Sequence, residues 1–312
     1  MSGFLFQTTR NILCELGASK KIGQLIQQTI NVNVSKNISK SMKPNVMLVT
    51  DNGIRSARLE EGCVKSLEEA GFDVTIYSDV VADPPEKYIH EAVEIAKMNN
   101  ACAIVGMGGG SSMDVAKLVA FLSNKENENN QILSDIYGVN QCVGNRLPLF
   151  QIPTTAGTGS EVTPISIITT GASEKKGVVS PQLLPDYAII DGNLTASVPH
   201  HVAAATGIDA MVHAIEAFTC KTKKNPLSDL LALEALRLLS SNIHTVSTVN
   251  TSSSTDSDSH MSALARSDML LGSMYAGMAF ANAPVGAVHA LAYPIGSIFH
   301  VPHGLSNALM LP

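Results

Sequence analysis

The stretch ACAIVGMGGGSSMDVAKLVAFL, residues 101–122, decides the fold class. Its first part, 101–108, is a continuous apolar run bounded by glycines, which is typical of a strand buried on both faces of a parallel sheet. The part from Met113 to Leu122 is expected to be a helix, and Ser111 or Ser112 can cap it. A buried strand that passes through a glycine turn into a helix predicts an α/β fold.

Strands and helices alternate on the N-terminal side of this stretch. Short apolar runs predict strands at 45–51 and 73–77, and the helix between them is expected to stop at Gly71. Residues 86–98 have the spacing of an amphipathic helix that leads into the buried strand. This order of strand, helix, strand, helix, strand predicts a doubly wound, Rossmann-like unit with a mostly parallel sheet.

Three further strands are predicted after the polar connection that follows residue 122. They are LFQI at 149–152, ISIITT at 165–170 and YAIID at 187–191. The segment SEKKG, 173–177, is predicted to be a turn between two of them. We therefore assign residues 1–193 to an α/β domain.

Residues 194–312 have a different composition, without further strand signals. Asn225 is the expected cap of a long helix that has Pro226 at its first position. The low-complexity segment 251–262 is predicted to be an exposed loop. A second long helix is expected at 262–282, rich in small residues, so we assign residues 194–312 to an all-helical domain.

The composition excludes several classes of protein. The chain has 312 residues, 45% of them apolar and 15% charged, which is typical of a globular protein. A net charge of −6 and the lack of a basic patch argue against a nucleic-acid partner. No apolar run reaches the roughly 18 residues of a membrane span. Five scattered cysteines predict reduced thiols and a cytoplasmic location, with an organelle as the alternative.

Two loops have the composition of a phosphate-binding site. The glycine turn holds Gly108, Gly109 and Gly110 before a helix N-terminus, which offers free N–H groups to an anion. An ordinary tight turn is the equally weighted alternative, because the sequence is neither GxGxxG nor a Walker A motif. The second loop, 153–164, has Thr154, Thr155, Thr158 and Ser160, whose hydroxyls can wrap a diphosphate and ribose, although hydroxyls are also common in turns.

A metal site is predicted around the stretch TGIDAMVHAIEAF, 206–218. Asp209 and His213 are four residues apart and therefore share one face of a helix. His289 and His303 can complete the site, and three imidazoles with one carboxylate suit Fe, Zn, Co or Ni better than Mg or Ca. Taken alone, His213 is more often an ordinary helix histidine than a ligand.

Four motifs, in this order, resemble the iron-containing (group III) alcohol dehydrogenases: GGGSSMDVAK, PTTAGTGSEVT, TGIDAMVHAIEAF and HALAYPIGSIFHVPHGLSNALMLP. The resemblance begins near Phe6 and covers nearly the whole chain. It implies a dehydroquinate synthase-like protein, in which an N-terminal domain binds NAD and a helical domain holds Fe(II), or alternatively Zn(II). It also implies a homodimer or larger homo-oligomer. Relatives of this kind continue past the position of Pro312, so we expect the helical domain to be truncated at its C-terminus.

The resemblance assigns roles to individual residues. The implied metal ligands are Asp209, His213, His289 and His303. The implied cofactor-binding residues are Asp51, Gly108, Gly109, Gly110, Ser111, Ser112, Asp114, Thr154, Thr155, Thr158, Ser160 and Lys176. Asp51 ends the first strand and would repel a 2′-phosphate, which favours NAD over NADP. Tyr293 stands where many relatives have a histidine, so the proton carrier is left open among Tyr293, His300 and water.

The implied function is hydride transfer between a small alcohol, or its aldehyde or ketone, and NAD. His289 and His303 would hold the metal that lowers the pKa of the alcohol. A glycerol dehydrogenase and a hydroxyacid–oxoacid transhydrogenase are alternatives within the same superfamily. A truncated, non-catalytic nucleotide-binding protein is the alternative from another class.

Overall fold

A parallel sheet forms the centre of the N-terminal domain in the computed structural model, which describes residues 3–33, 43–127, 130–171, 174–248, 256–299 and 301–311. Its strand order is β1-β9-β6-β4-β2-β3, and each neighbouring pair runs parallel. The strands are β1 (Asn11–Cys14), β2 (Asn45–Asp51), β3 (Asp73–Val80), β4 (Ala101–Gly108), β6 (Leu149–Pro153) and β9 (Tyr187–Ile190). The parallel α/β domain predicted from the sequence is therefore confirmed.

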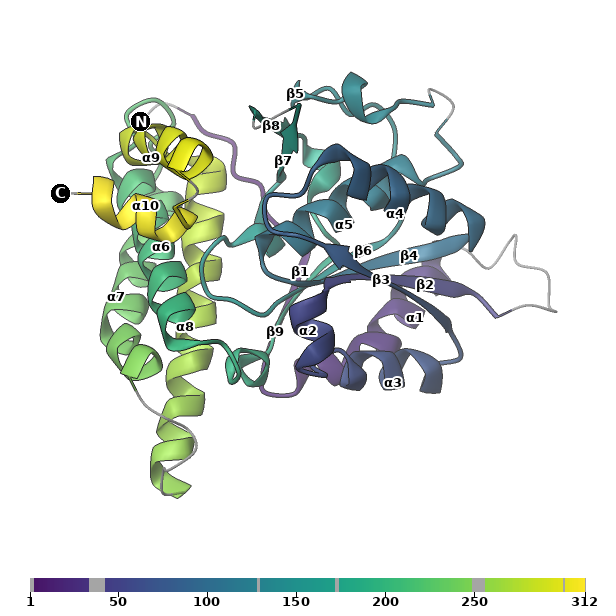
Figure 1. Cartoon of the computed structure of the whole chain (residues 1–312), viewed down its shortest axis with the longest axis horizontal. Coiled ribbons are helices and arrows are strands. Elements are labelled where there is room, and N and C mark those ends of the chain that lie inside the picture. The colour runs from purple at the N-terminus through teal and green to yellow at the C-terminus, as the bar shows by residue number, and fades with distance from the viewer. Residues whose placement is uncertain are drawn as a thin grey trace.

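Helices cover both faces of this sheet (Figure 1). On one face, α1 (Ile22–Asn33) and α3 (Glu61–Glu69) pack against apolar side chains of the central strands. On the other face, α4 (Glu86–Met98) and α5 (Gly110–Leu122) bury a second apolar cluster. Because both faces are covered, β4 is almost entirely buried, as its unbroken apolar run predicts.

The beginning of α5 differs from the prediction. The helix begins at Gly110, and Gly109, with an extended backbone, is the N-cap, without a side-chain cap hydrogen bond. Ser111 and Ser112 therefore lie inside the first turn and do not cap the helix. A glycine at this position leaves the first N–H groups of α5 without a competing side chain.

A small second sheet lies beside the main one and has the order β5-β8-β7. It consists of β5 (Gly138–Val139), β7 (Ile165–Thr170) and β8 (Glu174–Val179). The predicted turn at 173–177 is wrong for residues 174–177, because these residues pair antiparallel with β7. This strand was not predicted because it begins with three consecutive charged residues, and it is partly exposed.

Helices alone follow β9 in the described part of the chain, apart from the short 3₁₀ turn η5 (Gly192–Thr195). They are α6 (His200–Thr219), α7 (Pro226–Thr248), α8 (Asp256–Asn282), α9 (Ala287–Phe299) and α10 (His303–Met310). Figure 1 shows them stacked beside the end of the sheet at which its parallel strands terminate. A core rich in alanine and methionine lets α6, α7 and α8 pack closely.

Two predictions about helix ends have different outcomes. Asn225 caps α7 as predicted, since its Oδ1 accepts a hydrogen bond from the Ser228 N–H at 2.9 Å. The loop predicted at 251–262 is wrong for residues 256–262, which form the first turns of α8; the remainder of that segment lies outside the described residues. No helix in the described ranges is both long enough and apolar enough to cross a bilayer.

The N-terminal segment joins both domains. Strand β1 pairs with β9 at the edge of the sheet, in register from Asn11 with Tyr187 to Cys14 with Ile190. Ahead of it, the Gln7 N–H donates to Asn282 Oδ1 at 2.8 Å, and Asn282 Nδ2 donates to the Gln7 carbonyl at 2.9 Å. The segment is thus tied to the sheet and to the end of α8.

Candidate metal centre and nucleotide-binding loops

Helix α6 provides one wall of the candidate metal centre. Asp209, His213 and Glu216 are spaced by four and then three residues, so all three lie on one face of this helix. Each of them is at least 94% buried. A carboxylate, an imidazole and a second carboxylate, all withdrawn from water, need partners from other elements.

Helices α9 and α10 supply those partners. His289 lies in the first turn of α9, and His303 is the first residue of α10. The Nε2 atoms of His289 and His303 lie 3.7 and 3.6 Å from Asp209 Oδ1. One ligand atom from each of these three residues falls within 4.8 Å of the others, which is a separation that one ion can bridge.

His213 lies next to this group of three and not within it. Its Nδ1 is 4.0 Å from Asp209 Oδ2. The imidazole is stacked between Phe280, with ring centroids 4.4 Å apart, and His289, at 4.5 Å. Among the described residues, its Nδ1 is buried and has no hydrogen-bond partner.

Glu216 orients His289. Its Oε2 lies 2.6 Å from His289 Nδ1, and its Oε1 accepts from the Val288 N–H at 2.7 Å. A carboxylate beside Nδ1 requires a proton on that nitrogen, so the lone pair of His289 is on Nε2, which faces Asp209.

Burial keeps both inner imidazoles neutral. Desolvation, together with the charge of His303, lowers the pKa of His213 to about 3. Desolvation and the neighbouring His213 lower the pKa of His289 to about 4. Desolvation raises the pKa of Asp209, and His303 and His289 oppose that rise. At neutral pH both histidines therefore have the unprotonated nitrogens that metal ligation requires.

Asn307 is a further member of this site. It lies in α10, four residues after His303, and is completely buried. Its Nδ2 donates to Asp209 Oδ1 at 2.6 Å and lies 3.2 Å from His289 Nε2 and 3.3 Å from His303 Nε2.

These side chains fit a transition-metal ion. The donors are imidazole nitrogens and one carboxylate, a set that Fe(II) and Zn(II) both accept. The unpartnered buried Nδ1 of His213 is a further donor beside them. A buried polar atom without a partner is unusual in a folded protein, and a ligand in the site would satisfy it.

Of the two residues considered as proton carriers, the structure describes only Tyr293. Tyr293, one turn after His289, is 41% exposed and stacks on His303 with ring centroids 5.7 Å apart. Desolvation and the charge of Asp209 raise its pKa. His300 lies outside the described residues.

The glycine turn lies next to Asp51, because β2 and β4 are neighbouring parallel strands. Asp51 Oδ1 caps the short helix α2 (Asn52–Ser56) by accepting from the N–H groups of Gly53 and Ile54. Its Oδ2 accepts from Ser112 Oγ at 3.2 Å. Gly108 has φ +148°, and a Cβ there would lie 2.7 Å from Ser112 Oγ. The turn therefore requires glycine at Gly108.

The threonine-rich loop packs directly against the glycine turn. The Thr154 N–H donates to the Gly108 carbonyl at 2.9 Å. A Cβ at Gly110 would lie 2.8 Å from Thr158 Cγ2, whereas one at Gly109 would be 3.5 Å from Thr155 Oγ1. The N-terminus of α5 and the hydroxyls of both loops therefore lie together, an arrangement suited to a phosphate.

Asp114 and Ser160 contact each other. Ser160 Oγ donates to Asp114 Oδ1 at 2.6 Å, and the Ile167 N–H donates to Asp114 Oδ2 at 2.8 Å. Lys117, which is fully buried, donates to Ser160 Oγ at 2.7 Å and lies 3.5 Å from Asp114 Oδ1. These contacts hold α5 and the threonine loop in a fixed relation.

Lys176 lies apart from these contacts, on β8 in the small sheet. Its Nζ is 5.3 Å from the centre of the Tyr137 ring and 3.8 Å from Glu174 Oε2. Its side chain is 41% exposed, so it is accessible to a bound molecule.

The threonine loop also touches the helical domain. A Cβ at Gly157 would lie 2.8 Å from Thr206 Cβ in α6, and one at Gly159 would lie 2.6 Å from Gly277 Cα in α8. Gly159 also has φ +59°. The loop predicted to bind the cofactor therefore lies directly on the helix that provides Asp209 and His213.

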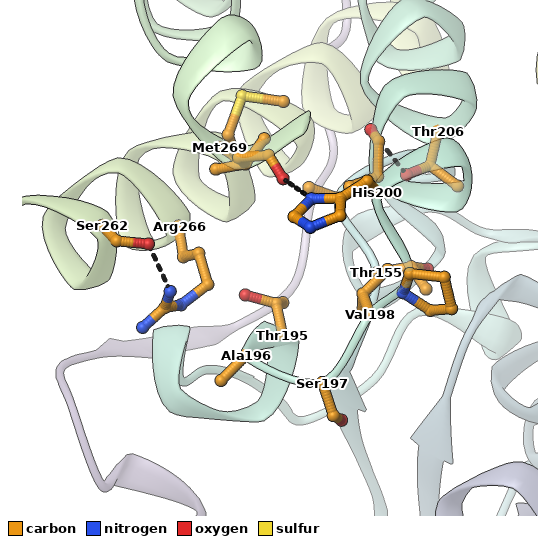
Figure 2. Close-up of a pocket in the computed structure, with 14 residues that line it drawn as sticks. Thr155, Thr195, Ala196, Ser197, Val198, His200, Thr206, Ser262, Arg266 and Met269 are labelled. Atoms are coloured by element: carbon orange, nitrogen blue, oxygen red, sulfur yellow. Dashed lines mark hydrogen bonds between the residues drawn. The ribbon is translucent and has the colours of Figure 1, made fainter. Parts of the chain in front are cut away.

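A pocket of about 250 Å³ lies beside the same loop, between η5, α6 and α8 (Figure 2). Thr155, Thr195, His200, Arg266 and Met269 are among the residues that line it. Arg266 Nη1 donates to Ser262 Oγ at 2.6 Å, and burial lowers the pKa of Arg266. A guanidinium that lines a pocket with hydroxyl side chains suits a polar or anionic group.

Glu216 and Asn307 were missed in the sequence. Both have the same signal as the predicted ligands, because Glu216 is three residues after His213 and Asn307 is four residues after His303. Helical spacing indicates which residues share a face. It does not indicate which polar side chain on that face reaches the ligands.

Comparison with known families gives a consistent result for both parts of the chain. Residues 11–192 match the family described as iron-containing alcohol dehydrogenase. Residues 203–312 match the C-terminal domain of the Fe-containing alcohol dehydrogenase family.

Individual proteins are similar to this chain in sequence or in structure. Long-chain-alcohol dehydrogenase 1 of Geobacillus thermodenitrificans is 41% identical over 268 residues, which are 86% of this chain and 65% of that protein. The crystal structure of a 1,3-propanediol oxidoreductase superposes with a TM-score of 0.87 at 29% identity, covering 100% of this chain and 75% of the other. Sulfoacetaldehyde reductase from Bifidobacterium kashiwanohense, in complex with NAD⁺, gives 0.83 at 26% identity, with coverages of 100% and 76%. The chain thus spans about two thirds of the length of the first of these relatives.

Proposed function

The chain belongs to the iron-containing alcohol dehydrogenase family, and from this premise we propose that it is an NAD-dependent, metal-dependent oxidoreductase of small alcohols and their aldehydes or ketones. The observation that carries the proposal is the convergence of Asp209, His289 and His303 on one point. The loops that suit a dinucleotide pack against the helix that holds this point. The NAD⁺ complex of sulfoacetaldehyde reductase and the alcohol-oxidising relatives support the choice of cofactor and substrate class.

We propose that Asp209, His213, His289 and His303 hold Fe(II), or alternatively Zn(II). When bound, the ion supplies the Lewis acidity that lowers the pKa of an alcohol, and NAD supplies the hydride acceptor. The side chains of the site favour binding of the metal ion. Glu216 keeps the lone pair of His289 directed at the site, and burial keeps His213 and His289 neutral at physiological pH.

The exposed edge of the site is where a substrate can enter. His303 has 43% of its side chain exposed, and Tyr293 stacks on it. Both remain accessible, whereas Asp209 and His289 are enclosed. We propose that an alcohol approaches over this edge and that Tyr293, which keeps its proton because its pKa is raised, can donate a hydrogen bond to the substrate oxygen.

We propose that the dinucleotide lies along the C-terminal edge of the sheet. Its pyrophosphate would lie at the N-terminus of α5, between Gly109, Gly110 and the hydroxyls of Thr155 and Thr158. The resemblance to the family includes Lys176 among the cofactor contacts. The tight packing of Asp114 against Ser160 supports a positioning role for these two residues, in addition to the predicted cofactor contact.

The negative charge of Asp51 favours NAD. Its carboxylate is fixed by α2 and by Ser112, so it cannot turn away from a 2′-phosphate beside the glycine turn. Asp51→Asn keeps an N-cap side chain and removes the charge. We expect this variant to raise kcat/KM with NADP relative to NAD; an unchanged ratio would contradict the assignment.

The test of the function is an anaerobic assay of the 312-residue chain. The protein is stripped of metal, loaded with Fe(II) or Zn(II), and mixed with NAD and ethanol, propane-1,2-diol or butan-1-ol. We expect NADH to form only with the metal present, and His289→Ala to lose both metal and turnover. Full activity of this variant would contradict the proposed centre.

Three remaining predictions accompany this function. We propose a division into residues 1–193, which bind the nucleotide, and 194–312, which hold the metal. The cytoplasmic location stays a prediction, as does assembly into a homodimer or larger homo-oligomer.

A further inference from the structure

The side-chain amide of Asn307 occupies the space between the predicted metal ligands. Its Nδ2 lies 2.6 Å from Asp209 Oδ1, 3.2 Å from His289 Nε2 and 3.3 Å from His303 Nε2. The same three residues each have one ligand atom within 4.8 Å of the others, as a potential ligand group. Asn307 itself is completely buried.

The chemistry of this contact resembles that of a cation. An amide NH₂ carries partial positive charge and two hydrogens, and it accepts no hydrogen bonds. It is therefore attracted to the Asp209 carboxylate and to the Nε2 lone pair of His289. The opposite end of the amide, Oδ1, is buried without a partner among the described residues. The reversed orientation would bring Oδ1 against the Asp209 carboxylate, so charge fixes the amide in the observed orientation.

The amide and an ion cannot use the same atoms together. A neutral imidazole has one lone pair, on the nitrogen that carries no proton. Glu216 accepts the proton of His289 Nδ1, so the Nε2 lone pair either accepts a hydrogen bond from Asn307 or binds a metal.

We propose that Asn307 is a displaceable stand-in for the metal ion, which holds the three ligands together in the metal-free protein and leaves them when the ion enters. This inference rests on the proposed metal centre. Asn307 and His303 are one turn apart on α10, so the displacement occurs within the helix that also carries a ligand. The residue stabilises the metal-free state and competes with the ion.

The proposal predicts that removal of the Asn307 amide increases the affinity for the metal ion. Removal of the amide takes hydrogen bonds from the metal-free protein only, because the ion replaces them in the loaded protein. Asn307→Ala should therefore unfold at a lower temperature without metal. It should also bind an ion more tightly, by roughly tenfold, since hydrogen bonds to a charged group are among the stronger ones.

Cobalt(II) is the probe, because its visible absorption reports binding without any turnover. We would titrate the metal-stripped wild-type chain, Asn307→Ala and the control Ser306→Ala under anaerobic conditions. Ser306 is the preceding buried residue of α10, and its hydroxyl lies 3.4 Å from the Val301 carbonyl, outside the group of ligands. The control should bind cobalt with wild-type affinity.

Equal or weaker binding of cobalt by Asn307→Ala would overturn the proposal, since Asn307 would then support the loaded site. If the wild-type chain itself does not bind cobalt, the proposed metal centre fails as well, and the two failures are thus distinguishable.

Discussion

The pair formed by Glu216 and His289 shows how a residue that binds no substrate can control the metal centre. Its 2.6 Å contact fixes which nitrogen of His289 faces the ligand group. Glu216→Gln keeps the shape and removes the charge that favours this tautomer. We expect zinc affinity to fall by about 10- to 100-fold, as for other residues that orient metal ligands.

The control for this prediction is Glu234→Gln. Glu234 pairs with Arg237 on the exposed side of α7, away from the site. A competition titration of zinc against a chelator measures both variants. Equal affinities for the two would mean that Glu216 has no role in orienting His289.

The stability of the metal-stripped protein should depend on pH. The pKa of His213 is lowered to about 3, whereas an unfolded histidine titrates near 6.5. Between these values the unfolded chain binds a proton that the folded chain does not. The free energy of unfolding must therefore decrease as the pH falls from 7 to 5, by about 1–2 kcal/mol from His213. In urea titrations of the metal-stripped protein, His213→Gln should show a smaller decrease than the wild type; an identical decrease would refute the lowered pKa.

The predicted ligands illustrate what spacing in a sequence can and cannot determine. The i, i+4 pair of Asp209 and His213 was correctly expected on one face of a helix. Spacing could not show that His289 and His303 lie nearer to Asp209 than His213 does. That arrangement depends on the packing of α9 and α10 against α6, which involves residues far apart in the chain.

Lys117 connects helix α5 to the loop that follows β6. Its ammonium is fully buried and donates to Ser160 Oγ at 2.7 Å, to Thr163 Oγ1 at 3.2 Å and to the Ile165 carbonyl at 2.6 Å. Burial lowers the pKa of Lys117, and Asp114 opposes this. The cation therefore holds together the two segments predicted to bind the pyrophosphate.

Removal of this ammonium should be strongly destabilising. Lys117→Met leaves Asp114 and several acceptors without their partner, and we expect a loss of about 3 kcal/mol in the free energy of unfolding. The matched control is Lys125→Met, because Lys125 is exposed and its Nζ donates to Asn100 Oδ1 at 2.6 Å, far from this network. Urea unfolding measures both. Similar losses for the two variants would show that the buried network contributes little.

The elements predicted correctly are those with a strong apolar period. Strand β4 and helix α4 have the predicted bounds, because their buried faces determine both the pattern and the ends. The errors occur where burial is weak. Strand β8 consists partly of charged residues, and α8 begins in a segment rich in serine and aspartate, which has no apolar periodicity to predict a helix.

The whole molecule depends on a close contact between its domains. Gly159 in the threonine loop and Gly277 in α8 meet without side chains between them, since a Cβ at Gly277 would lie 2.8 Å from the Gly159 carbonyl. The sequence predicted two domains. It could not predict this contact, because both residues are glycines and only the folded arrangement brings them together.

A pair of substitutions tests the contact. A change from glycine to alanine inside a helix normally stabilises by about 1 kcal/mol. We expect Gly62→Ala, where the nearest atom to the new Cβ is the flexible Lys20 Cγ at 3.3 Å, to be neutral or stabilising. Gly277→Ala should instead destabilise by about 1–3 kcal/mol, and calorimetry should show weaker NAD binding. Stabilisation by both changes would contradict a tight domain contact.

The pairing of β1 with β9 has a consequence for the order in which the protein acquires its shape during synthesis. Residues 11–14 leave the ribosome long before residues 187–190, which are their only strand neighbours in the described sheet. The intervening chain must fold first, and a long loop must then close at an entropic expense. The hydrogen bond between Gln7 and Asn282 can form only later, because Asn282 is synthesised after β9. Residues 11–14 are therefore among the last to take their place in the sheet, and until then the edge of β9 stays open to other chains.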